Sequence, residues 1–191
     1  MKNMKKFAAI FAVLTISVVS QSFAQATYVM STGTELMVSG TSTLHDWEMK
    51  SSKGTGQAVV TIENGAFKGI QSLSVSLTAE TLESGKSQMD KNAYKALKTD
   101  KNPQIKYVLK DIKSGQGNTW TATGDLTIAG VTKTITMPVT VNQQGNVLEF
   151  TGSISTKLTE FKIDPPTAML GTIKTGNDVK LSFSAKFNPS K

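Results

Sequence analysis

The chain has no cysteine, no arginine and only one histidine, His45, among its 191 residues. Without cysteine it has no disulfides, no thiolate metal ligands, no thiol catalysis and no acylated lipoprotein cysteine. A single histidine cannot supply the usual zinc-binding sets either. We therefore predict no metal site and no cofactor, and we expect packing and backbone hydrogen bonds to provide the stability.

The positive charge comes entirely from lysine. The 21 lysines and 14 acidic residues give a net charge of +7. Three lysines lie in the first 26 residues, so the rest of the chain has 18 lysines and a net charge of +4. The lysines are scattered and lack the planar fork with which arginine binds phosphates. We predict no nucleic-acid partner.

The chain also lacks a long apolar segment. The apolar run at residues 8–20 follows three lysines and is too short to span a bilayer comfortably. An Ala-Gln-Ala sequence ending at Ala26 then fits the small-x-small rule of signal-peptide cleavage. We predict a secretory signal peptide over residues 1–26, with Ala24 as a second cleavage site, and a single domain over 27–191. The mature protein is then expected to be periplasmic or secreted, without stable membrane insertion.

The sequence does contain repeated alternation of apolar and polar residues, as in SLSVSLT, TKTITMPVTV and KLSFSAKF. This period places alternate side chains on opposite faces of a sheet. Hairpin turn residues fall between the runs, at 64–65, 114–118, 129–130 and 145–146. A meander of this length splits into a sandwich or closes into a barrel. Up to nine strands are predicted, near residues 28–39, 45–50, 56–63, 66–80, 104–113, 118–128, 132–142, 147–158 and 178–188.

One segment has helical periodicity instead. Residues 87–98 place apolar side chains on one face, and Ser87 with Asp90 has the spacing of a capping box. We predict an amphipathic helix that covers an open barrel end.

The stretch at residues 164–177 is long for a connection inside a compact domain. Long ordered loops are often lids or binding loops. We expect it either at a cavity mouth or against the barrel exterior.

The segment GTSTLHDW, residues 40–47, places His45 beside an acid and near serine and threonine. On a strand, adjacent residues point to opposite faces, so Asp46 cannot orient the His45 ring, and no GxSxG elbow is present. His45 and Trp47 would share one face, so a structural or ligand-lining role is favoured over catalysis. Glu80 and Glu83 are a second candidate acid pair, but surface positions are favoured for them.

The order of elements resembles the YceI-like family of exported lipid- and polyisoprenoid-binding proteins. The similarity runs from about residue 34 to 188, and its most specific piece is GDLTIAGVTK followed by an alternating strand. It is supported upstream by Pro103-x-Ile105-x-Tyr107. The resemblance implies an all-β, eight-stranded antiparallel barrel of lipocalin-like shape, capped by the helix. It also implies an apolar tunnel that holds an isoprenoid or another long-chain amphiphilic lipid.

We therefore expect a non-enzymatic carrier, storage or scavenging protein. Two alternatives remain open: an exported enzyme acting on a hydrophobic or carbohydrate substrate, and a filled barrel that acts as a structural or interaction module. A homodimer is also left open. The predicted ligand-binding residues are His45, Trp47, Val75, Leu77, Met89, Tyr94, Leu97, Ile105, Tyr107, Trp120, Ile135, Met137, Phe150, Phe161, Met169 and Leu170. Eight of them would be buried in a plain core as well: Val75, Leu77, Ile105, Tyr107, Trp120, Ile135, Met137 and Phe150. Five are expected at the entrance: Met89, Tyr94, Leu97, Met169 and Leu170.

Overall fold

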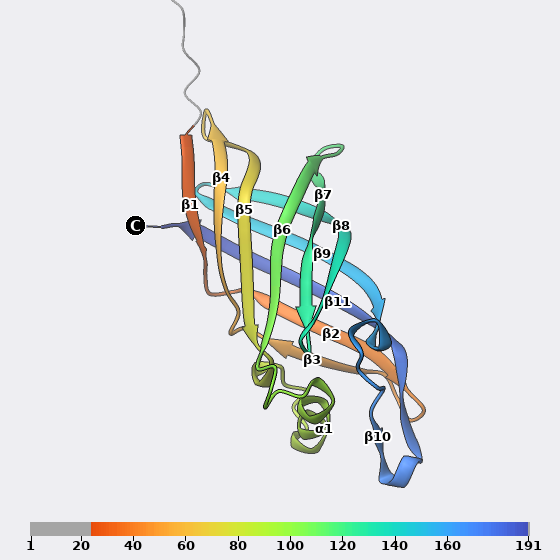
Figure 1. Ribbon diagram of the computed structural model, residues 1–191. Helices are drawn as coiled ribbons and strands as arrows, with labels where there is room; N and C mark the ends of the chain where they lie inside the picture. Colours follow the sequence, from red (N-terminus) through yellow and green to blue (C-terminus); the bar gives the residue numbers. More distant parts are fainter. Residues whose placement is uncertain (1–23, 191) are drawn as a thin grey trace, which may run out of the picture.

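The computed structural model describes residues 24–190, which form a closed antiparallel sheet with one α-helix (Figure 1). The predicted turns at 64–65, 114–118, 129–130 and 145–146 all join consecutive strands. In order, the elements are β1 (Ala24–Met30), β2 (Glu35–Ser42), β3 (Trp47–Ser51), β4 (Thr55–Glu63), β5 (Ala66–Thr78), the short 3-10 turn η1 (Ala79–Thr81), α1 (Ser87–Leu97), β6 (Gln104–Ser114), β7 (Thr119–Ile128), β8 (Val131–Gln144), β9 (Val147–Lys157), η2 (Leu158–Phe161), β10 (Thr167–Ala168), η3 (Met169–Gly171) and β11 (Ile173–Pro189).

Eight strands close the barrel in the order β1, β4, β5, β6, β7, β8, β9 and β11, and β11 returns to β1. The last strand closes it because its two ends have different neighbours. Near its C-terminal end Pro189 lies opposite Tyr28 of β1, whereas Phe183 lies opposite Leu36 of β2. The β2–β3 hairpin therefore extends from the barrel wall beside β11. The predicted eight-stranded antiparallel barrel is confirmed.

The strand predicted over residues 28–39 is wrong, because the chain turns within it and forms β1 and β2. Gly33 has a φ of +83° at this turn, a conformation that glycine adopts without the penalty of a β-carbon. The Thr34 hydroxyl donates a hydrogen bond to the Ser31 carbonyl oxygen over 3.0 Å. The turn allows one continuous chain segment to pair with both ends of β11.

The strand predicted to begin at residue 45 begins instead at Trp47. GTSTLHDW forms the end of β2, the hairpin loop and the start of β3, with Gly40 paired to Trp47. The Ser42 amide donates to the His45 carbonyl oxygen over 3.1 Å and closes the loop. A β-carbon on Gly40 would lie 2.6 Å from the Trp47 ring, so this cross-strand pair requires glycine.

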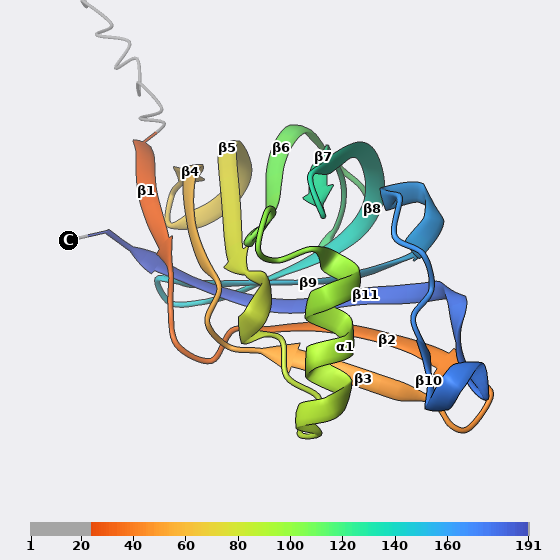
Figure 2. The ribbon, with the colours of Figure 1, turned by 60° about the horizontal axis from the view of Figure 1, so that its bottom comes forward.

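The predicted helix is confirmed as α1, which crosses the opening between the β2–β3 hairpin and the β5–β6 wall (Figure 2). Its Met89, Ala93 and Tyr94 pack against a cluster that contains Met49 and Leu82. This apolar face explains why a helix interrupts the sheet at this point, because burial of one face stabilises a short helix.

The predicted capping box is wrong. Lys86 occupies the N-cap position, and no side chain caps the first turn of α1. The Asp90 carboxylate accepts hydrogen bonds from the Ser84 amide (2.8 Å) and the Ser84 hydroxyl (2.6 Å) instead. Asp90 thus fixes the loop that leads into the helix.

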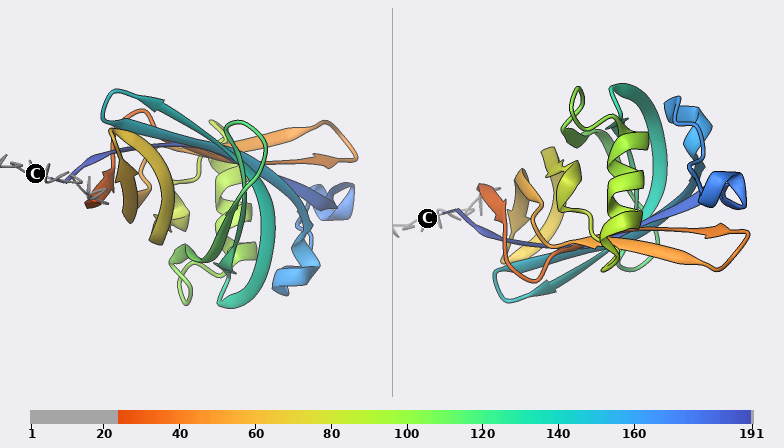
Figure 3. Two further views of the ribbon diagram at one scale, coloured as in Figure 1. Left: turned by 90° about the horizontal axis from the view of Figure 1, so that it is seen from above. Right: turned by 90° about the horizontal axis from the view of Figure 1, so that it is seen from below.

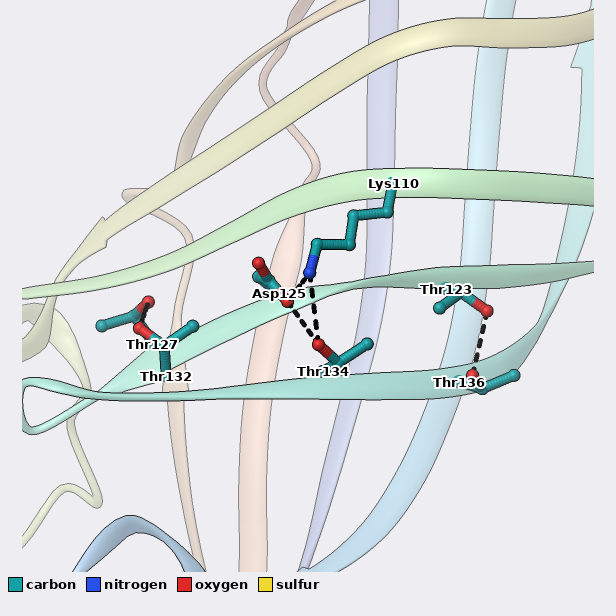
Figure 4. Close-up of polar contacts among 7 residues, drawn as sticks. All are labelled: Lys110, Thr123, Asp125, Thr127, Thr132, Thr134 and Thr136. Atoms are coloured by element: carbon teal, nitrogen blue, oxygen red, sulfur yellow. Dashed lines mark hydrogen bonds and ion pairs between the residues drawn. The ribbon is translucent and has the colours of Figure 1, made fainter.

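The outer face of β6, β7 and β8 carries a row of polar cross-strand pairs (Figure 4). Thr123 pairs with Thr136 over 2.9 Å, and Thr127 with Thr132 over 2.8 Å. Between them, Lys110 Nζ lies 2.8 Å from an Asp125 carboxylate oxygen, which also accepts a hydrogen bond from the Thr134 hydroxyl over 2.6 Å. These bonds, chiefly that from Lys110, lower the pKa of Asp125. The row shows that odd-numbered residues of β7 face outward.

Most of the predicted signal peptide, residues 1–23, lies outside the described residues. Its last three predicted residues are described, and they form the start of β1. Ala24, Gln25 and Ala26 lie opposite Ile62, Thr61 and Val60 of β4. The cleavage position stays a prediction.

Candidate ligand-binding cavity

The barrel encloses a cavity of about 580 Å³ that is lined almost entirely by apolar side chains. It extends from Phe150 and Phe187 in the packed part of the barrel to α1 and the loops at the opposite end. Among the residues that line it, none is an aspartate or a glutamate, and its cationic or titratable basic groups are Lys86, Lys106 and His45. The wall therefore suits a hydrocarbon chain, and its polar groups do not favour a cationic head group.

The inward face is the one that the alternation predicted. Val75 and Leu77 of β5, and Ile135 and Met137 of β8, all lie on the cavity wall. Ligand contact itself stays a prediction. Thirteen of the sixteen predicted residues lie on the cavity wall: His45, Trp47, Val75, Leu77, Met89, Leu97, Ile105, Tyr107, Ile135, Met137, Phe150, Phe161 and Met169.

Three predicted residues do not lie on the wall. The Tyr94 hydroxyl is within hydrogen-bonding distance of the backbone oxygens of Glu80 (2.9 Å) and Leu82 (2.8 Å), so the ring supports the loop before α1. Trp120 packs edge-on against Phe67, with ring centroids 5.2 Å apart, in the filled end of the barrel. Leu170 is fully exposed, at 108%. Periodicity assigns a face of an element, but it does not give the depth of a residue along the barrel.

The prediction also missed several wall residues. Leu36 and Val38 of β2, Met49 of β3, and Leu181 and Phe183 of β11 all line the cavity. The alternation in β11 had indicated its inward face, so that signal was present in the sequence. The β2 contribution could not be found this way, because the turn after β1 had not been recognised.

His45 is exposed at the cavity mouth and is not part of a catalytic arrangement. Its Nδ1 lies 2.6 Å from the backbone oxygen of Asp46, not from a carboxylate. The Ser42 hydroxyl donates to the His45 carbonyl oxygen over 2.7 Å, so its proton is directed to the backbone rather than to the imidazole. A triad needs a histidine that receives the serine proton and an acid that orients the ring. Neither contact exists here.

The second acid candidate is not a paired site either. The Glu80 carboxylate accepts a hydrogen bond from the Thr99 hydroxyl over 2.7 Å. Glu83 forms an isolated bridge with Lys50 through the two backbones. Neither glutamate lines the cavity.

The hydroxyl of Tyr107 lies on the cavity wall. Among the side-chain nitrogen and oxygen atoms of residues 24–190, it is the one that is buried without a hydrogen-bond partner. The phenol lies over Gly124 of β7, where a β-carbon would come within 2.6 Å of the hydroxyl oxygen. Burial, with a smaller contribution from the charge of Asp125, raises the pKa of Tyr107 to about 12. The phenol therefore stays neutral at physiological pH and gives this wall a buried polar atom.

The stretch at 164–177 lies at the mouth, which was one of its two predicted positions. It forms the β10–β11 hairpin, and Pro166, Ala168, Met169 and Ile173 line the cavity. Residues of this hairpin, of α1 and of the β2–β3 loop all line this end of the cavity.

A closed antiparallel barrel around an apolar cavity, with a helix over its open side, defines the class of lipocalin-like barrels. Residues 17–187 match the YceI-like domain, and the chain belongs to this family. It is 33% identical over 109 residues to a UPF0312 protein of Pseudomonas putida, an alignment that covers 53% of this chain and 57% of that protein. The chain thus spans little more than half the length of the curated relatives that it matches.

Solved structures share the fold at lower sequence identity. Burkholderia cenocepacia BcnA is 21% identical, with a TM-score of 0.68 over 80% of this chain and 95% of that one. A polyisoprenoid binding domain from Saccharophagus degradans is 10% identical, with a TM-score of 0.65 over 87% and 100%. The YceI protein of Campylobacter jejuni is 16% identical, with a TM-score of 0.55 over 100% and 99%.

Proposed function

We propose that this protein is an exported, non-enzymatic binding protein that holds an isoprenoid or another long-chain amphiphilic lipid in its barrel. The observation that carries the proposal is the apolar cavity of about 580 Å³, a size within the range of roughly 300–1,000 Å³ of small-molecule sites. Burial of a hydrocarbon chain contributes about 0.8 kcal/mol per CH₂ group, offset in part by ordering of the chain. A hollow interior also argues against the filled barrel of a purely structural module.

Family membership and a neighbour described as a polyisoprenoid binding domain support the same ligand class. The absence of acidic residues from the wall favours a neutral or anionic head group. His45 and Lys86 lie at the mouth, where they would meet such a head group while the chain extends inward. Among residues 24–190, no helix has the length and apolar character that a membrane crossing requires.

The direct test is organic extraction of the purified protein followed by mass spectrometry, together with uptake of a fluorescent polyprenyl alcohol. We expect a stoichiometric long-chain lipid and saturable uptake. Protein that is empty in repeated preparations and takes up no probe would refute the binding function. N-terminal sequencing of protein from the culture medium and the periplasm tests export separately, with a processed end after Ala26 or Ala24 expected.

Met137→Glu provides a sharper test of the cavity. Met137 is 8% exposed and lines the wall, so a carboxylate there would be buried without a partner, at a cost of several kcal/mol. We expect loss of probe uptake or a clear fall in melting temperature. The control is Thr136→Glu on the neighbouring, exposed residue, which should leave uptake intact. Equal behaviour of the two variants would mean that the ligand does not use this face.

A further inference from the structure

Three large apolar side chains are exposed around the mouth of the cavity. Leu44 is 65% exposed, Met169 is 74% exposed and Leu170 is completely exposed, at 108%. In the rest of the described chain, the large exposed apolar side chains are Val29, at 38%, and Val108, at 51%. The most exposed apolar groups are thus concentrated at the end where a ligand would enter.

These side chains come from two loops that are bonded to each other. The Thr43 amide donates to the Lys174 carbonyl oxygen over 2.9 Å, and the Lys174 amide donates to the Thr43 hydroxyl oxygen over 3.1 Å. The Thr43 hydroxyl in turn donates to the Thr172 carbonyl oxygen over 3.3 Å. We call residues 43–45 and 168–172 the mouth tip. Figure 3 shows the β2–β3 hairpin and the β10 segment projecting from the same end of the barrel.

Part of the mouth-tip backbone has an unfavourable conformation, the left-handed region, at two non-glycine residues. Met169 and Leu170 have φ values of 51° and 55°, and Gly171 follows at 89°. Left-handed backbone is disfavoured for aliphatic residues, and strain of this kind concentrates at functional segments. Here it places two large apolar side chains on a protruding turn.

The mouth tip is also suited to an apolar environment. Residues 165–173 contain no charged side chain, and residues 39–45 contain none apart from the titratable His45. Part of the backbone at the tip is bonded internally, through Thr172 N to Met169 O (3.2 Å) and Thr175 N to Pro166 O (3.0 Å). Backbone polar groups that enter lipid must be satisfied within the protein, and these two bonds satisfy part of the backbone at and beside the tip.

We propose that the mouth tip inserts shallowly into the surface of a lipid bilayer, and that the ligand passes between the bilayer and the cavity there. This inference rests on the proposed lipid-binding function. Leu44 and Met169 contact both the exterior and the cavity, so an apolar path continues from the tip into the barrel. The three exposed side chains offer roughly a few hundred Å², well below the about 800 Å² per partner of a stable protein interface. A protruding tip of this size, with no charged side chain apart from the titratable His45, fits a lipid surface better than a protein partner.

The test uses flotation of the full-length mature protein with vesicles of phosphatidylethanolamine and phosphatidylglycerol. We expect binding that depends only weakly on salt, because the tip carries no charged side chain apart from the titratable His45. The variant Leu44→Ser, Met169→Gly, Leu170→Gly should bind vesicles at least about tenfold more weakly, since each lost side chain removes apolar burial. Glycine suits the left-handed backbone at 169 and 170, so the tip should keep its shape.

Two further measurements separate this inference from the proposed function. Uptake of the fluorescent polyprenyl alcohol from vesicles should slow at least about tenfold in the variant. Leu170→Gly alone, which changes no residue of the cavity wall, should also slow this uptake but should leave the equilibrium affinity for probe added without vesicles unchanged. Val108→Ser, which removes an exposed valine from the outer face of β6, is the matched control and should behave as wild type. The docking site would be overturned if the wild-type protein did not float with the vesicles, or if the variant floated as well as wild type. It would also be overturned if the substitutions changed only self-association, measured by analytical ultracentrifugation. Failure to take up the probe under every condition, with flotation intact, would overturn the lipid-binding function instead.

Discussion

At the scale of single residues, Tyr107 shows how the wall combines packing with an unsatisfied polar atom. Its ring contacts two of the apolar clusters inside the barrel, and its hydroxyl lies over Gly124 without a hydrogen-bond partner in the described chain. A buried hydroxyl without a partner costs about 1–3 kcal/mol. The aromatic ring, and not the hydroxyl, therefore provides the stabilisation at this position.

Tyr107→Phe should keep the ring contacts and remove the unsatisfied atom. We expect unfolding in urea at neutral pH to show unchanged or higher stability, by up to about 1 kcal/mol. A loss of more than about 1 kcal/mol would show that the hydroxyl has a partner.

The same variant has a predicted pH signature. The ordinary tyrosine pKa is 10.0, and the pKa of folded Tyr107 is raised to about 12. Between these values the unfolded chain loses the proton while the folded chain keeps it, so stability falls as pH rises. In thermal melts from pH 9 to 12, Tyr107→Phe should show a shallower alkaline loss than wild type. The pKa of Tyr28 and Tyr94 is also raised by burial, so these residues retain part of the slope.

At the scale of elements, α1 acts as a cover whose position depends on the loop before it. Its Met89, Ala93 and Leu97 face the cavity, while Asp90 bonds to Ser84 and fixes the approach to the first turn. No residue of α1 is fully buried, so the helix is held by one apolar face and a few polar contacts. Elements with little buried surface open locally more readily than the rest of a fold.

Asp90→Ala should loosen this cover, because two hydrogen bonds to Ser84 are lost. We expect a loss of about 0.5–2 kcal/mol in stability, comparable to loss of a helix cap, and faster hydrogen exchange in residues 84–97. Dissociation of the fluorescent polyprenyl alcohol should also accelerate. Lys91→Ala, on the exposed face of the same helix, is the control and should change neither quantity. Equal exchange rates in wild type and Asp90→Ala would rule out this role for the Ser84 contacts.

At the scale of the whole molecule, the barrel has closed edges but an incompletely filled interior. Pairing of β11 with both β9 and β1 closes the barrel, and an aromatic cluster of Phe67, Phe150 and Phe187 fills one end. The other end is hollow, and no cysteine is present to compensate with a disulfide. A bound hydrocarbon chain would then act as part of the core.

Removal of bound lipid should therefore lower the melting temperature. A ligand at 100 times its dissociation constant stabilises the folded state by about 2.7 kcal/mol. For a domain of this size that corresponds to a shift of roughly 5–10 °C. Calorimetry of extracted protein, before and after addition of the polyprenyl alcohol, measures the shift. An identical melting temperature in both states would contradict a ligand that completes the core.

Much of the fold follows from local patterns. Alternation of apolar and polar residues identified most of the strands, and it gave the inward face of β5, β8 and β11, because side-chain direction in a strand repeats every two residues. Turn residues such as Asn64-Gly65 marked the hairpins, since they tolerate positive φ. The helical period of residues 87–98 likewise identified the cover. These features depend on near neighbours in the chain, so the sequence by itself determined them.

Other features depend on residues far apart in the chain, and only the tertiary structure decided them. The different partners of the two ends of β11 close the barrel, and the bond between Thr43 and Lys174 joins loops separated by 131 positions. Trp120 and Met137 both occur on alternating strands, yet only Met137 reaches the cavity, because Trp120 packs edge-on against Phe67, a residue distant in the chain. Whether the interior is filled or hollow depends on how all inward side chains meet. Packing between distant segments sets that volume, and no periodicity along the chain encodes it.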